Sequence, residues 1–163
     1  MSDSAGYGVR VVNAGLSGET SAGALRRLEW LLSERAALVL IETGANDGLR
    51  GLDVDSTRAN LASIVRLVRR DRPEATVLLA QMEAPPNLGD AYTQRFHSNY
   101  AVVAKAEGAE LVPFLLDGIA GVRRLNQSDG IHPTEEGAIR VARNLWPSLA
   151  PHLARLAKAA RTS

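Results

Sequence analysis

An acid and a histidine lie three residues apart in the run Asp129-Gly130-Ile131-His132-Pro133. A carboxylate can fix the tautomer of a neighbouring histidine and stabilise the imidazolium that forms when the ring accepts a proton. A single short loop that supplies both residues would fix their relative placement, so the pair could serve as a general base with its orienting acid. Asp, Gly and Pro are also common turn residues, and Asp129 could instead only cap a local bend.

The composition favours one globular domain spanning residues 1–163, with 45% hydrophobic and 23% charged residues. Nineteen Lys and Arg against eighteen Asp and Glu give a net charge near zero, so neither nucleic acid nor an anionic membrane is expected as a partner. The sequence has no cysteine, which excludes disulfides, thiolate metal ligands and a cysteine nucleophile. No apolar run approaches the ~20 residues of a membrane span.

Strand and helix patterns alternate along the chain. β-branched or apolar runs predict four strands, at Val9–Asn13, Ala37–Thr43, Thr76–Met82 and Glu110–Val112. Apolar residues at helical spacing predict helices that start near Thr20 or Ser21 and cover Thr57–Arg70 and Tyr92–Ala106, then a weak helix over Phe114–Arg124. Thr134 is predicted to cap a last helix with Ile139 facing inward, which Pro147 and Pro151 interrupt.

This alternation predicts an α/β fold, a three-layer α/β/α arrangement with a parallel sheet. Ligands of such sheets bind outside the carboxyl ends of the strands. Polar breaks follow the strands there, at Ser17-Gly18, Gly44–Gly48 and Ala84–Asn87, and the loop that holds Asp129 and His132 can reach the same rim.

Gly18 and Asn46 follow successive predicted strands. Acyl transfer builds an oxyanion, which needs N–H donors aimed at it in advance. Gly18 would let a backbone N–H approach a substrate closely, and Asn46 would offer its side-chain amide. The alternative interpretation is that both are ordinary turn residues.

A metal site is not expected, because Asp129 and His132 are too few ligands. His97 and His152 fall in helical patterns without an acid cluster and are predicted to be surface histidines. The large aromatic residues Trp30, Trp146, Phe96 and Phe114 are predicted to lie in the core. A metal-dependent hydrolase that uses Asp129 and His132 remains a further alternative.

Three ordered segments together resemble the SGNH (GDSL) hydrolase family, in its branch of arylesterases, acyl-CoA thioesterases and lysophospholipases. They are Val11–Thr20, Glu42–Gly51 and Asp129–Pro133. The resemblance implies a flavodoxin-like fold and a serine esterase or thioesterase that acts on small acyl esters or thioesters without a metal or organic cofactor. It places Asp129 and His132 in the catalytic triad, and Gly18 and Asn46 in the oxyanion hole.

The family's first strand ends in Gly-Asp-Ser-Leu, whose serine is the nucleophile, and this motif is not in the sequence. We therefore expect an N-terminally truncated chain whose first block has been lost upstream of residue 5. Ser4 is a weak stand-in, because it would lie about 16 Å from the active rim, the length of the predicted first strand. Ser17 lies on the correct rim but not at the family's nucleophile position. A non-catalytic remnant or binding module is therefore the alternative to an esterase.

Residues 1–8 lack the basic and apolar regions of a signal peptide. Members of the resembled family are often periplasmic or secreted. The sequence itself predicts neither a compartment nor an oligomeric state.

Overall fold

The computed structural model describes residues 6–162, which fall into two compact units. Unit 2 comprises Asn13–Val112, and unit 1 comprises the described residues before Asn13 together with those from Pro113 on. Each unit is described by itself, and the single domain expected from the sequence stays a prediction.

Unit 2 contains a parallel sheet of three strands, in the order β1-β2-β3. The strands are β1 (Leu38–Ile41), β2 (Thr76–Ala80) and β3 (Glu110–Val112). Leu38 pairs with Thr76, and Leu78 pairs with Glu110. The central strand β2 is almost fully buried, as expected of an apolar parallel strand. The predicted α/β class with a parallel sheet is confirmed.

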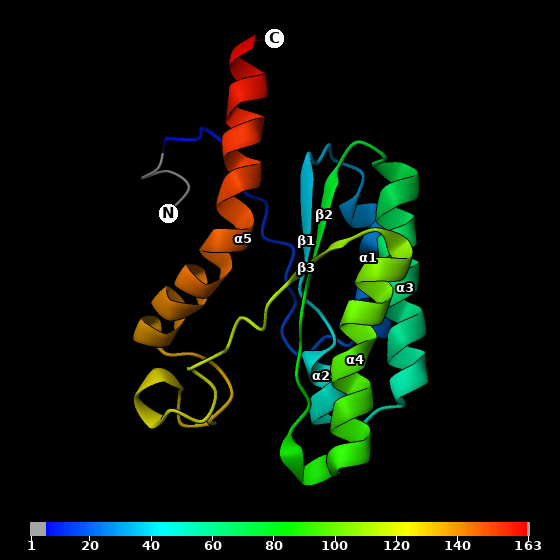
Figure 1. Cartoon of the computed structure of the whole chain (residues 1–163), viewed down its shortest axis with the longest axis vertical. Helices are drawn as coiled ribbons and strands as arrows, with labels where there is room; N and C mark the ends of the chain where they lie inside the picture. Colours follow the sequence, from blue (N-terminus) through cyan, green and yellow to red (C-terminus); the bar gives the residue numbers. More distant parts are fainter. Residues whose placement is uncertain (1–5, 163) are drawn as a thin grey trace. The chain divides into compact units, whose positions relative to one another are not determined.

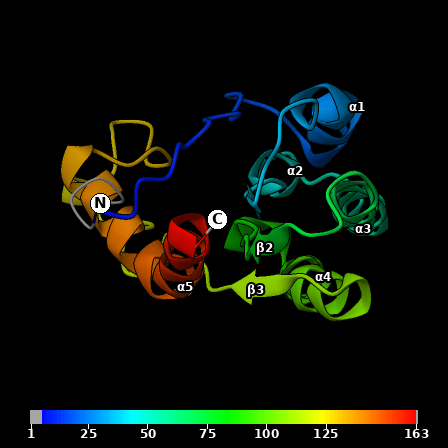
Figure 2. The ribbon, with the colours of Figure 1, turned by 90° about the horizontal axis from the view of Figure 1, so that it is seen from above.

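Three helices lie on one side of this sheet: α1 (Ser21–Leu31), α3 (Val54–Asp71) and α4 (Asp90–Glu107) (Figures 1 and 2). The apolar face of α3 carries Leu61, Ile64, Val65 and Val68, all at most 2% exposed. On α4, the rings of Phe96 and Tyr100 meet edge to face with centroids 5.7 Å apart. These residues form the core that supports the carboxyl ends of the strands.

Short helices occupy two of the predicted polar breaks. The break after β1 is the five-residue helix α2 (Ala45–Leu49), and η1 (Pro86–Leu88) follows β2. Gly44 begins α2 with φ at +95°, and a Cβ there would collide with the hydroxyl of Tyr100. The Gly44–Gly48 segment is therefore a constrained helical turn rather than an open loop.

The prediction of a strand at Val9–Asn13 is wrong. These residues are irregular, and Val11 and Val12 are 74% and 60% exposed. A strand needs a neighbour to receive its backbone N–H and C=O groups, and no strand in the described part of the chain pairs with this segment. A β-branched run alone does not provide that neighbour.

The predicted helix over Phe114–Arg124 is also wrong, because the chain forms turns there, followed by η2 (Arg123–Leu125). Gly118 and Gly121 adopt positive φ angles, which a right-handed helix does not accommodate. Trp30, predicted to lie in the core, is 74% exposed on α1.

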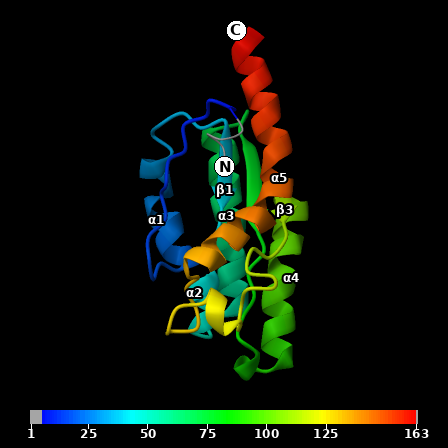
Figure 3. The same cartoon turned by 90° about the vertical axis from the view of Figure 1, so that its left-hand side faces the viewer.

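The last helix of unit 1, α5 (Glu135–Thr162), continues through Pro147 and Pro151, so the predicted interruption is wrong. Its axis changes direction along its length (Figures 1 and 3), as expected where proline removes a helical hydrogen bond. Thr134 accepts the N–H of Gly137 at 3.2 Å, as predicted for a cap, but Ile139 is 49% exposed rather than inward. No helix within residues 6–162 is both long and apolar enough to cross a membrane.

Candidate active site

Asp129 and His132 are in direct contact in unit 1. Oδ2 of Asp129 lies 2.8 Å from Nδ1 of His132, and Oδ1 accepts the backbone N–H groups of Ile131 and His132 at 2.9 and 3.0 Å. The aspartate therefore caps a turn and holds the histidine at the same time. The two interpretations of this motif are compatible, because separate oxygens serve the two contacts.

The loop that carries this pair is closed by its own backbone. Gln127 donates its N–H to the carbonyl of His132 at 2.8 Å, and its side chain donates to the carbonyl of Pro133 at 3.0 Å. Buried Asn126 anchors the start of the loop by donating to the carbonyls of Ile119 and Val122. The positions of Asp129 and His132 are thus set by contacts inside one short segment and its base.

The electrostatics of the pair favour an ionised acid. The N–H of Ile131, the His132 ring and the N–H of His132 lower the pKa of Asp129 to about 2. A carboxylate beside Nδ1 favours the tautomer with its hydrogen on that nitrogen, which leaves Nε2 as a proton acceptor. Nε2 of His132 has no hydrogen-bond partner among residues 6–162, and the side chain is 62% exposed.

Gly18 lies in unit 2, in the turn before α1. Its φ of +75° is a left-handed conformation that favours glycine. Its carbonyl accepts a guanidinium N–H of Arg50 at 2.8 Å. Its own N–H has no hydrogen-bond partner within the described residues, as an oxyanion donor requires.

Asn46 lies in the first turn of α2 and is half-buried. Its side-chain amide has no hydrogen-bond partner across the residues that the structure describes, so its two N–H donors are available. Arg50, at the other end of the same short helix, binds Gly18. The structure thus ties the two predicted oxyanion donors to one local framework.

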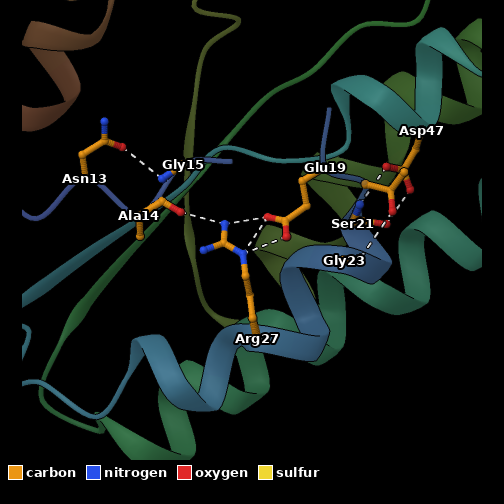
Figure 4. Close-up of polar contacts among 9 residues, drawn as sticks. Asn13, Ala14, Gly15, Glu19, Ser21, Gly23, Arg27 and Asp47 are labelled. Carbon is orange, nitrogen blue, oxygen red and sulfur yellow. Dashed lines mark hydrogen bonds and ion pairs between the residues drawn. The ribbon is translucent and has the colours of Figure 1, made fainter. Parts of the chain in front are cut away.

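A buried aspartate, Asp47, forms the centre of that framework (Figure 4). Its carboxylate accepts the N–H and the hydroxyl of Ser21 at 2.8 and 2.5 Å, and the hydroxyl of Thr57 at 3.2 Å. Asn60 donates to the same Ser21 hydroxyl at 3.0 Å. Asp47 therefore joins the residue after Asn46 to the start of α1, just beyond the Gly18 turn.

An ion pair fixes the other side of this turn. The guanidinium of Arg27 contacts both carboxylate oxygens of Glu19 at 2.6 to 3.0 Å and donates to the carbonyl of Ala14 at 2.7 Å (Figure 4). The hydrogen bond to Glu19 is the main reason that the pKa of Arg27 is raised. The segment on either side of Gly18 is therefore held at both ends.

The structure brings Asp129 together with His132, and it joins Gly18 to the helix of Asn46; these two halves belong to different units. Ser4 lies outside the described residues, and Ser17 is exposed in the turn before Gly18. His97 is mostly exposed, as predicted, but its Nδ1 lies 2.7 Å from a carboxylate oxygen of Glu83. No group of three His, Cys, Asp or Glu side chains that could hold a metal is found within residues 6–162.

Sequence reasoning missed Asp47, Ser21 and Arg50 as parts of this site. Asp47 resembled a turn residue beside Asn46, and Ser21 resembled a helix cap. One signal was available: Thr57 places a hydroxyl on the otherwise apolar stripe of Leu61, Ile64 and Val68, which indicates a buried polar partner.

Comparison with known proteins identifies the family. Residues 3–139 match the GDSL-like lipase/acylhydrolase family. Esterase TesA of Pseudomonas aeruginosa is 48% identical over 91% of this chain and 73% of its own length. Thioesterase 1/protease 1/lysophospholipase L1 of Escherichia coli K12 is 36% identical over 86% of this chain and 67% of its own.

The fold agrees with this assignment. The crystal structure of esterase EstA from Pseudoalteromonas sp., inhibited by monoethylphosphonate, shares 35% sequence identity with this chain. It matches with a TM-score of 0.86, over 93% of this chain and 82% of the EstA chain. From its sequence and its fold, the chain belongs to the GDSL-like lipase/acylhydrolase family.

Proposed function

We propose that this chain carries the acid–base pair and the oxyanion donors of a serine esterase that hydrolyses small acyl esters or thioesters. The observation that carries the proposal is the contact of 2.8 Å between Asp129 and Nδ1 of His132, with Nε2 left available, in a member of an acylhydrolase family. Relatives named as an esterase and as a thioesterase support both kinds of acyl substrate.

In the proposed mechanism, a serine attacks the carbonyl carbon of the acyl group while Nε2 of His132 takes the proton of its hydroxyl. Asp129 stabilises the imidazolium through Nδ1. The N–H of Gly18 and the amide of Asn46 hold the negative charge on the carbonyl oxygen. His132 then returns its proton to the departing alkoxide or thiolate, and water removes the acyl group from the serine by the same steps.

The printed sequence contains no Gly-Asp-Ser-Leu, so this mechanism takes its serine from a segment other than residues 1–163. We do not assign the role to Ser4 or Ser17, because neither stands in that motif. The proposal for residues 1–163 is therefore the half of the machinery that moves the proton and holds the oxyanion.

The test is to join residues 1–163 to an upstream segment that carries Gly-Asp-Ser-Leu, and to assay this extended chain with p-nitrophenyl acetate and a short acyl-CoA. We expect turnover of at least one substrate, and its loss in the His132→Ala variant. A folded extended chain without activity, or activity that survives His132→Ala, would contradict the proposal.

A non-catalytic binding module with the same fold is the second candidate, favoured by the missing serine motif. In that case residues 1–163 neither turn over an ester nor react with a fluorophosphonate probe, and the extended chain stays inactive. Labelling of Ser4 or Ser17, located by mass spectrometry, would exclude this candidate.

A further inference from the structure

A shallow hollow of about 280 Å³ lies beside the Gly18 turn, at the amino end of α1. Two arginines, small residues and one leucine line most of it: Leu16, Gly18, Thr20, Gly23, Arg26 and Arg50. Pockets that enclose a whole small ligand usually measure about 300 to 1,000 Å³. The size of this hollow therefore suits one small group of a larger ligand.

The two arginines of the hollow have most of their hydrogen-bonding capacity unused. Arg50 donates one N–H to the carbonyl of Gly18 at 2.8 Å, and Arg26 makes no hydrogen bond or ion pair within residues 6–162. Neither has a carboxylate partner in the described part of the chain. A guanidinium carries five N–H donors, so both side chains can still accept an anion.

The acids near the hollow do not neutralise these cations. Glu19 lines the hollow, but both of its carboxylate oxygens are taken by Arg27 (Figure 4). Asp47 is 2% exposed and is bound by Ser21 and Thr57.

The amino end of α1 is not the source of the positive charge. The N–H of Ser21 goes to Asp47, and the N–H of Gly23 goes to the side chain of Thr20. With these first-turn donors already used, recognition of an anion in the hollow depends on Arg26 and Arg50.

We propose that Arg26 and Arg50 bind a phosphate group carried by the acyl donor, either in a nucleotide leaving group or in a lipid headgroup. The planar guanidinium matches the oxygens of phosphate with paired N–H donors. The bound phosphate lies beside Gly18, and Leu16, 61% exposed, offers apolar contact at the same place. The identification of the ligand as an acyl donor rests on the proposed function.

Direct binding to residues 1–163 tests the site without any need for turnover. Titration calorimetry with inorganic pyrophosphate at low salt is expected to show saturable binding. Arg26→Gln and Arg50→Gln are each expected to weaken it about tenfold, the usual effect of losing one charged hydrogen-bonding group.

The matched control is Arg35→Gln, which removes the same charge from an exposed arginine beyond the other end of α1. We expect its affinity to stay within about twofold of the parent, with circular dichroism confirming that all variants fold. Absence of saturable binding, or an equal loss in all three variants, would overturn the proposed site.

Two further probes separate the sources of the phosphate. Tighter binding of coenzyme A than of pyrophosphate would support a nucleotide leaving group, and tighter binding of glycerophosphoglycerol would support a lipid headgroup. Pyrophosphate binding with neither organic probe would overturn the link to an acyl donor. An inactive extended chain that still binds pyrophosphate through the arginines would contradict the proposed function but not the anion site.

Discussion

The two halves of the candidate active site are held in opposite ways. Asp129 and His132 are exposed, and their bonds join residues at most six positions apart within the loop. Asp47 is 2% exposed, and it binds Ser21 across 26 positions of the sequence. Arg50 reaches Gly18 across 32 positions. The first half is a local structure, whereas the second depends on the packing of α1, α2 and α3.

This difference separates function from stability. A change in the exposed local pair removes few buried contacts, so it should alter activity with little effect on folding. A change in the buried network should alter both, because the bonds that place Gly18 and Asn46 also connect α1, α2 and α3. The predictions below test this separation.

The largest expected effect is in the exposed half. In the extended chain, Asp129→Asn should lower kcat about 10⁴-fold, because the histidine loses the acid that sets its tautomer. The free energy of unfolding should change by no more than about 0.5 kcal/mol, as for other exposed substitutions. Initial rates and urea unfolding measure the two quantities.

Asp117→Asn is the matched control, since Asp117 is an exposed acid of the same unit whose side chain makes no contact in the described structure. It should leave kcat within about twofold. A loss of activity in Asp129→Asn that is matched by a loss of stability would mean that the loop is not an independent local structure.

The second prediction concerns the donor with no internal partner. Asn46→Ala should lower kcat about 10²- to 10³-fold, the usual effect of losing one oxyanion donor. Asn46→Asp keeps the size of the side chain but removes its N–H donors, so it should lose at least as much activity. If Asn46→Asp instead retains full activity, the amide of Asn46 does not hold the oxyanion.

The third prediction addresses the buried network. Asp47→Asn weakens charged hydrogen bonds from Ser21 and Thr57 and should lower the free energy of unfolding by about 2 kcal/mol. Because Asp47 also supports the turn of Gly18, kcat of the extended chain should fall as well. Urea unfolding and initial rates together measure this double effect.

Asp55→Asn provides the comparison. Asp55 is 54% exposed and pairs with Arg58 and Arg95, so its loss should cost less than about 1 kcal/mol. Equal destabilisation by the two substitutions would show that the buried network is no more important to stability than a surface ion pair.

The same contrast explains which features the sequence predicts. The contact of Asp129 with His132, the cap at Thr134 and the strand Glu110–Val112 depend on neighbouring residues, and all three are found where a local pattern predicts them. The roles of Asp47 and Arg50 depend on residues tens of positions away, and no local pattern reveals them.

Failed predictions have the same cause. The β-branched run at Val9–Asn13 satisfies a local preference for strand, but a strand also requires a partner. Pro147 and Pro151 disfavour helix locally, yet α5 continues through both and is held near its middle by Asn144, which donates to the carbonyls of Leu115 and Asp117. Tertiary contacts thus override local preference in both directions.

The smallest expected effect is a shift in the titration of Asp129, whose pKa is lowered from an ordinary 3.8 to about 2. Since the pKa is lower in the folded chain, the stabilisation is present above about pH 4 and is lost as the pH falls towards 2. Carboxyl ¹³C NMR of residues 1–163 should give a midpoint near 2.

His132→Ala tests the local origin of this shift. The midpoint should rise but stay below 3.8, because the N–H of Ile131, the largest cause of the lowered pKa, remains in place. Asp47→Asn should not move it, since no bond of the buried network involves Asp129. A midpoint of Asp129 that follows the stability of the buried network would show that the two halves are coupled, and the separation between local and long-range construction would fail.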